Sequence, residues 1–155
     1  MKALALRVVI AAGLVIGGAS HAYLYLHGYG QVPTIGPAFL IQASVSFAAA
    51  MLILAGGPDW LIWGAGALAL GSLGAFAMSR TIGLAGFIER GWQPAPHALV
   101  SVVAEAVTAL ACGAWALGAA RARGRSARRR QSERTEHRRV AEDGDACDRP
   151  RPVLG

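Results

Sequence analysis

The chain alternates between long apolar stretches and short connections that are polar or rich in glycine. Four stretches approach the length of about 20 residues that a helix needs to cross a bilayer, and they cover residues 7–26, 37–55, 60–78 and 98–119. Glycine and proline, which interrupt helices, occur in the connections between them. The pattern predicts an all-α membrane protein, an antiparallel four-helix transmembrane bundle.

Charge divides the chain into two regions. Residues 1–120 form the predicted four-helix transmembrane domain, and residues 121–155 are rich in arginine and acid with few large apolar side chains. Such a composition predicts a disordered, arginine-rich tail. Charged residues make up 15% of the whole chain, against about 25% in soluble domains. The four spans therefore disfavour a soluble enzyme or a transcription factor.

Basic residues lie near the start of the first span and directly after the fourth. The positive-inside rule then predicts that the N and C termini are both cytoplasmic. The abundance of alanine, glycine and arginine suggests a bacterial genome, and so a bacterial plasma membrane. The partners expected for the tail are anionic lipid headgroups, which give about 1 kcal/mol for each basic residue. No nucleic-acid partner is predicted.

The first span has two interpretations. Ser20, His21 and Ala22 follow an apolar run and resemble a signal-peptide cleavage site. Hydrophobicity nevertheless continues to Leu26 and gives a full spanning length. We therefore expect an uncleaved first span, with cleavage as the alternative.

Polar residues recur at a similar depth below the outer membrane face. His21, Gln42 and Glu105 lie roughly 8–10 Å inside their spans at 1.5 Å of rise per residue, and Arg80 lies at the outer end of the third span. A polar or charged side chain in hydrocarbon is costly, which makes it a functional-site hypothesis. We predict that these residues, here called the polar layer, bind a ligand in an outward-facing pocket.

Helical spacing predicts which faces are buried. Residues four apart, or three and four apart, share one face of a helix. The three faces identified in this way are His97, Ser101, Glu105, Thr108 and Cys112; Gly13, Gly17 and His21; and Ala67, Gly71 and Ala75. They direct His21 and Glu105 inward and predict close helix packing at the small residues. The same small residues allow a homo-oligomer or a membrane-protein partner.

The chemistry of the polar layer has several interpretations. Glu105 either pairs with Arg80 or His21 and holds the helices in register, or handles a ligand or a proton. A metal site is not predicted, because His97 lies about two helical turns above Glu105. Haem would need facing histidines at matched depth, and His21 and His97 do not match. No catalytic motif is present, so no catalytic residue is predicted and a non-enzyme is favoured.

The segment after the third span mixes aromatic, charged and glycine residues. Glu89, Trp92 and His97 are predicted to form a lid beside the polar layer. The alternative is an interfacial connector whose side chains lie among the lipid headgroups.

The chain resembles small four-span bacterial membrane proteins of unassigned function over residues 1–120. The resemblance rests on the string from His21 to Tyr25, on the segment from Ser79 to Phe87 and on Glu105. Ala85 departs from it, since members often have proline there. A looser, architectural likeness is to DoxX-like proteins, which implies redox or quinone-linked processes. The resemblance leaves the activity open, and the polar layer predicts ligand or partner binding by the outer pocket. The alternative is a quinone- or haem-binding subunit of a membrane redox system.

Overall fold

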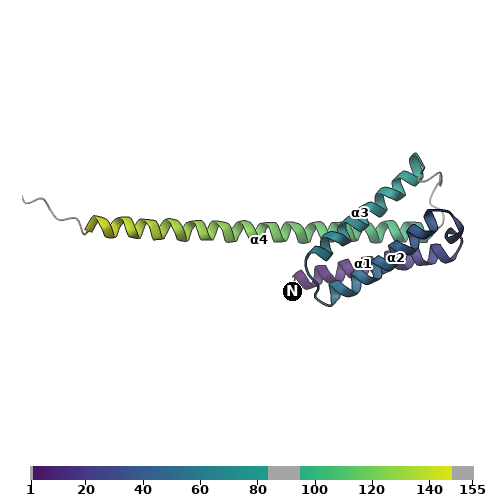
Figure 1. The fold of residues 1–155 in the computed structure, drawn as a ribbon, viewed down its shortest axis with the longest axis horizontal. Helices are drawn as coiled ribbons and strands as arrows, with labels where there is room; N and C mark the ends of the chain where they lie inside the picture. The colour runs from purple at the N-terminus through teal and green to yellow at the C-terminus, as the bar shows by residue number, and fades with distance from the viewer. Residues whose placement is uncertain (1, 84–94, 148–155) are drawn as a thin grey trace, which may run out of the picture. The chain divides into compact units, whose positions relative to one another are not determined.

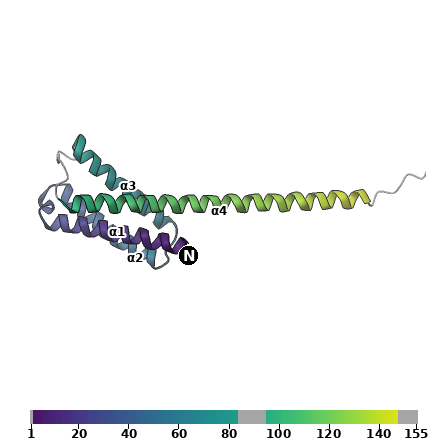
Figure 2. The same cartoon turned by 180° about the vertical axis from the view of Figure 1, so that it is seen from behind.

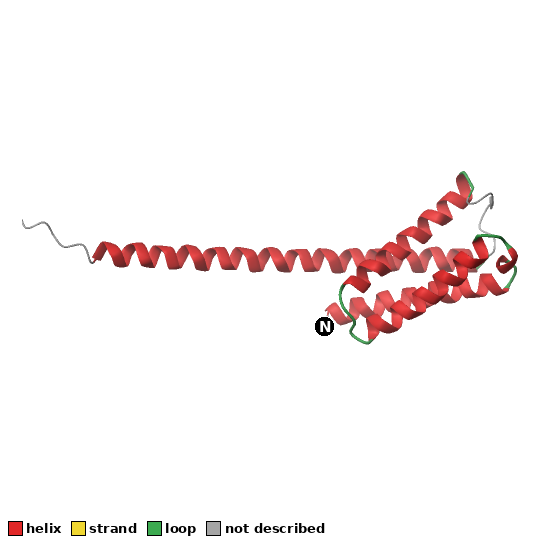
Figure 3. Ribbon diagram, in the orientation of Figure 1, coloured by secondary structure: helices red, strands yellow, loops and turns green. Residues whose placement is uncertain are grey.

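The computed structural model describes residues 2–83 and 95–147. Four α-helices and one short 3-10 helix follow in the order α1 (Lys2–Leu26), η1 (Tyr29–Gln31), α2 (Ile35–Leu54), α3 (Trp60–Thr81) and α4 (His97–Cys147) (Figure 1). No strand occurs in these described residues (Figure 3). All four α-helices are long and apolar enough to cross a membrane. The predicted fold class is confirmed, and the chain is a multi-pass membrane protein by length and composition.

Several helix ends differ from the predicted spans, and α1 begins at Lys2 rather than Arg7. Helix α2 begins at Ile35 rather than Pro37, because a proline is tolerated in the first turn, where its missing N–H would have no partner in the helix. Helix α3 continues to Thr81 rather than Met78. Arg80 therefore lies in the last turn of α3 and is held by the helix.

The region beyond Ala120 also differs from the prediction. The sequence predicts disorder from Arg121 onward, whereas α4 continues as a helix to Cys147. Alanine, arginine, glutamine and glutamate are good helix formers whether or not they have an apolar face to bury. An i,i+4 ion pair between Arg129 and Glu133, at 3.0 Å, adds to this preference. The chain divides into two compact units, Met1–Trp115 and Ala116–Gly155.

The core of the first unit lies toward the turn that joins α2 to α3. Its buried apolar cluster consists of Ile10, Ala11, Leu14, Ala50, Ile53, Leu61, Ile62, Ala65, Ala111 and Cys112. Small residues bring the helices close: a Cβ at Gly13 would overlap the Thr108 side chain, and one at Gly18 would lie 3.1 Å from the Cβ of Ser46. Helix α1 thus packs against both α2 and α4 (Figure 2).

Arg7 joins three parts of the chain at the end of the bundle where α2 turns into α3. One guanidinium nitrogen donates to the carbonyl oxygens of Ile53 and Gly57, at 3.3 and 2.9 Å, and the other donates to Asp59 at 3.0 Å. Asp59 is the N-cap residue of α3, but its side chain makes no capping hydrogen bond. The Asp59 side chain therefore bonds to Arg7 and does not cap α3.

Replacing Arg7 by methionine is expected to lower the free energy of unfolding by about 1–3 kcal/mol, because partly buried carbonyl groups lose their donor. Asp59→Asn should cost less than about 1 kcal/mol, since that side chain is 64% exposed and the carbonyl bonds persist. Reversible unfolding in mixed micelles measures both values. Equal costs for the two variants would contradict the role of the carbonyl bonds.

Candidate functional site

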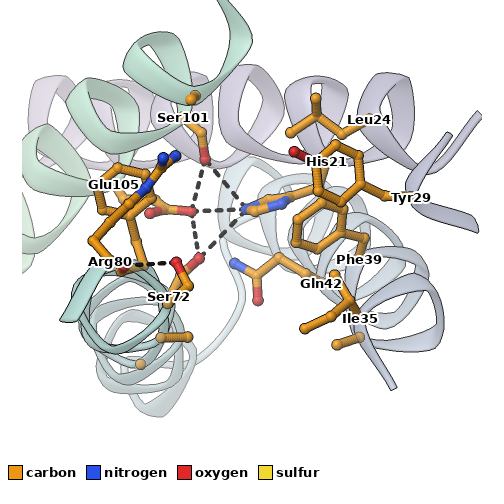
Figure 4. Close-up of a pocket in the computed structure, with 16 residues that line it drawn as sticks. His21, Leu24, Tyr29, Ile35, Phe39, Gln42, Ser72, Arg80, Ser101 and Glu105 are labelled. Carbon is orange, nitrogen blue, oxygen red and sulfur yellow. Dashed lines mark hydrogen bonds and ion pairs between the residues drawn. The ribbon is translucent and has the colours of Figure 1, made fainter. Parts of the chain in front are cut away.

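The polar layer lines a cavity of about 230 Å³ in the half of the first unit where α1 ends and α4 begins. His21, Gln42, Arg80 and Glu105 all line it (Figure 4). One comes from each of α1, α2, α3 and α4 in turn, so all four α-helices build the cavity. The structure thus brings together the four residues that the sequence selects.

A buried pair forms the centre of this site. The Nε2 atom of His21 lies 2.8 Å from Oε1 of Glu105, and the two side chains are 9% and 6% exposed. This contact joins α1 to α4. Both residues lie on helical faces that the sequence predicts to point inward. Of the two partners considered for Glu105, His21 is the one that the structure places within hydrogen-bond distance.

Two serines complete the hydrogen bonding of the same carboxylate oxygen. The hydroxyl of Ser72 donates to Oε1 of Glu105 at 2.5 Å, and the hydroxyl of Ser101 donates to it at 3.1 Å. Both hydroxyls also lie near Nε2 of His21, at 3.4 and 3.3 Å. Oε1 is thus surrounded by donors from α1, α3 and α4 (Figure 4).

The sequence does not identify Ser72 as part of the site. Serine in a membrane helix commonly bonds to a carbonyl of its own helix, as Ser20 does to Ile16 and Ser44 to Leu40. The only available signal is depth: Ser72 lies roughly 14 Å from the outer end of α3 and Glu105 roughly 12 Å from that of α4. Depth alone does not separate Ser72 from the other serines.

The hydrogen bonds of His21 indicate its tautomer. Nε2 faces Glu105, whereas Nδ1 is buried and has no hydrogen-bond partner among the described residues. A proton on Nε2 is donated to the carboxylate, while a proton on Nδ1 would be a buried donor without an acceptor. We therefore assign the proton to Nε2 from the network. Phe39 packs on the ring, with centroids 5.0 Å apart.

The second oxygen of Glu105 is available to a ligand. All three hydrogen bonds to this carboxylate end on Oε1, and none from a described residue reaches Oε2. Glu105 lines the cavity. A buried carboxylate normally accepts further hydrogen bonds, because unmatched buried charge is costly. Oε2 is therefore an acceptor without a donor among the described residues, and the carboxylate that carries it is held in place through Oε1.

Gln42 and Arg80 add polar groups to the cavity wall. Both side chains are half-buried, and the guanidinium of Arg80 lies over the ring of Phe76, 4.6 Å from its centroid. Such a contact holds a cation against an aromatic face. The position of Arg80 in the last turn of α3 places it toward the outer mouth of the cavity.

The predicted lid is described only at His97. Glu89 and Trp92 lie outside the described residues. His97 begins α4, and its ring stacks on Tyr23 with centroids 3.8 Å apart, while the ring of His27 stacks on Tyr23 at the same distance. His97 is not among the described residues that line the cavity. Its ring thus packs beside the mouth, at the end of α1.

The residues considered for metal or haem ligation lie apart in the part of the chain that the structure describes. It contains no group of three or more histidine, cysteine, aspartate or glutamate residues that could hold a metal ion. The two histidines considered for haem are also separated, since His21 pairs with Glu105 and His97 stacks on Tyr23.

The cavity ends at the polar layer on its inner side. The apolar cluster of the core follows toward the inner face of the bundle. Thr108, the next polar residue along that face of α4, returns its hydroxyl to the carbonyl of Ala104. No described polar side chain continues the site toward the apolar cluster, so the cavity is closed at that end.

Comparisons with protein-family models, curated proteins and solved structures gave no match. The resemblance to small four-span and DoxX-like proteins therefore stays a prediction.

Proposed function

We propose that this chain is an integral membrane protein that binds a small ligand in the cavity beside His21 and Glu105. One observation carries the proposal: Glu105 lines the cavity, three donors hold its Oε1, and no described residue bonds to its Oε2. The arrangement positions a buried acceptor before a ligand arrives. Preorganised groups of this kind reduce the free-energy cost of binding.

Ligand binding explains this geometry better than helix packing alone. A hydrogen-bonded pair that served helix packing alone would be enclosed by side chains, because protein interiors contain few voids larger than a water molecule. Here the pair borders a cavity of about 230 Å³ with aromatic side chains in its wall. Typical ligand pockets have volumes of about 300–1,000 Å³ and mostly apolar walls with a few polar groups. The cavity thus favours a small molecule or one part of a larger one.

The hydrogen bonds do not support a hydrolytic triad. In such a triad the acid binds one nitrogen of the histidine and the nucleophilic hydroxyl binds the other. Here Glu105, Ser72 and Ser101 all approach the same atom, Nε2 of His21. The carboxylate and the hydroxyls therefore compete for one proton, and a binding role is favoured over catalysis.

The proposed setting is a bacterial plasma membrane with both termini on the cytoplasmic side. Arg7 near the inner end of α1 and the arginines after Ala120 in α4 support this orientation through the positive-inside rule. The cavity then opens on the outer side. A quinone- or haem-binding subunit is the alternative function.

Filling the cavity from α3 should remove its ligand. Gly71 lines the cavity, and a Cβ there would meet no atom within 4 Å. Gly64 on the same helix is equally unobstructed and does not line the cavity. Gly71→Leu should therefore fill the cavity, and Gly64→Leu changes helix propensity by the same amount.

Mass spectrometry of solvent extracts from the purified proteins tests this expectation. A compound should be present with the wild type and with Gly64→Leu, and about tenfold depleted with Gly71→Leu, as expected when a site loses at least 1.4 kcal/mol of affinity. Identical extracts from all three proteins would count against a cavity ligand. A Soret band in the wild-type absorption spectrum would instead support the haem alternative.

A further inference from the structure

The wall of the cavity is open at Gly71. This residue lines the cavity, is exposed and has no neighbour within 4 Å of an ideal Cβ. It lies roughly 15 Å below the outer end of α3, which is about half the thickness of the hydrocarbon core. An exposed cavity wall at this depth faces lipid tails, because water does not reach the middle of the bilayer.

The helices flanking this opening are α2 and α3. In the inner half they pack together, with Ala50 and Ile53 of α2 in one cluster with Ile62 and Ala65 of α3. Farther out, α3 diverges from the α1–α2 pair toward its C-terminal end (Figure 1). The outer halves of both helices line the cavity instead of contacting each other closely. This geometry gives the cavity a lateral opening toward the outer leaflet.

The lining has a polar inner end and largely apolar walls. Its apolar walls include Leu24, Ile35, Ala38, Phe39, Ala75 and Phe76, and Glu105, whose Oε2 accepts no hydrogen bond from a described residue, also lines it. Oε2 requires a donor, which a hydroxyl group supplies without bringing another charge into a medium of low dielectric constant. The apolar walls suit a hydrocarbon chain.

We propose that the ligand is a membrane-dissolved amphiphile with a hydroxylated head, and that it reaches the site sideways between α2 and α3. This inference rests on the proposed ligand-binding function and names its ligand class. The head hydroxyl donates to Oε2 of Glu105, and the chain passes the open wall at Gly71 into the outer leaflet.

Spin-label accessibility tests the lateral opening. A nitroxide is placed at Gly71→Cys in a background without Cys112 and Cys147, in phosphatidylcholine nanodiscs. Collisions are measured with oxygen, which dissolves in lipid, and with a water-soluble nickel chelate. Matched controls are Leu70→Cys, whose native side chain is 62% exposed on α3, and Gln31→Cys, at an exposed site in η1.

The label at Gly71 should resemble the label at Leu70 and collide mainly with oxygen. If the ratio of oxygen collisions to nickel-chelate collisions at Gly71 resembles the ratio at Gln31, the opening faces water. That result would overturn the lateral route and leave the proposed binding function intact.

A second measurement tests the ligand class with 1-O-dodecylglycerol in the same nanodiscs. Native mass spectrometry should find it retained about tenfold better than its di-O-methyl ether, because the ether lacks the donor for a charged acceptor. Gly71→Leu should lose this retention and Gly64→Leu should keep it. Equal retention of the alcohol and the ether would overturn the hydroxylated head.

The same measurement with glycerol distinguishes failure of the amphiphile proposal from failure of the proposed binding function. If glycerol is retained as well as 1-O-dodecylglycerol, the ligand is a water-soluble molecule and the amphiphile proposal fails. The cavity-filling comparison of Gly71→Leu with Gly64→Leu then still decides whether the cavity binds a ligand at all.

Discussion

Replacing Glu105 by alanine is expected to lower the free energy of unfolding by about 3–5 kcal/mol, the usual cost of removing one member of a buried pair. The variant would leave Nε2 of His21 and the hydroxyls of Ser72 and Ser101 without their common acceptor. Three helices would lose a shared contact. Glu105→Gln keeps an acceptor of the same shape and should cost less, about 1–2 kcal/mol.

Steric trapping in bicelles measures these free energies, and Asp59→Asn provides the control. Asp59 is a carboxylate in the same bundle, but its side chain is 64% exposed. Its conversion to an amide should change both stability and ligand retention less than Glu105→Gln does. Equal tolerance of the two amide variants would show that the polar layer contributes no more than ordinary packing.

Gly13→Leu is expected to destabilise the bundle by about 1–3 kcal/mol or more, the range found when a packed core is overfilled. Even a Cβ at Gly13 would overlap the Thr108 side chain and lie 3.1 Å from the carbonyl oxygen of Ala104. Helices α1 and α4 would have to separate. The same two helices hold the buried pair, with His21 about two turns from Gly13 and Glu105 less than one turn from Thr108, so the pair should weaken as well.

Two comparisons make this expectation specific. Gly113→Leu alters α4 at a site where a Cβ meets nothing within 4 Å, so it should be nearly neutral in the same unfolding measurement. Gly13→Ala should be partly rescued by Thr108→Ala, which removes the overlapping hydroxyl. A Gly13→Leu protein as stable as the Gly113→Leu protein would contradict close packing of α1 on α4.

The sequence predicts the helices and the central pair because both depend on strong local signals. Four apolar stretches define the spans, and the spacing of Gly13, Gly17 and His21 orients α1 correctly toward α4. Glu105 is identifiable because a carboxylate in hydrocarbon is rare and costly. Because misplacing these residues costs free energy, their positions can be predicted from a single sequence.

Other parts of the site depend on tertiary geometry that no local pattern contains. Ala67, Gly71 and Ala75 have the spacing of a packing strip, yet Gly71 has no close neighbour and borders the cavity. The divergence of α3 determines this outcome, and it is not visible in the periodicity. Ser72 is missed for a related reason, since its partner lies on α4 and most serines bond within their own helix.

Arg7 has a consequence for the order in which the protein is assembled during synthesis. Its guanidinium is satisfied by Ile53, Gly57 and Asp59, which the ribosome adds about fifty residues after Arg7 itself. A nascent chain that ends before Asp59 carries this arginine without its final partners. The first helix can therefore enter the bilayer early, but it reaches its final register only when the α2–α3 hairpin has been inserted.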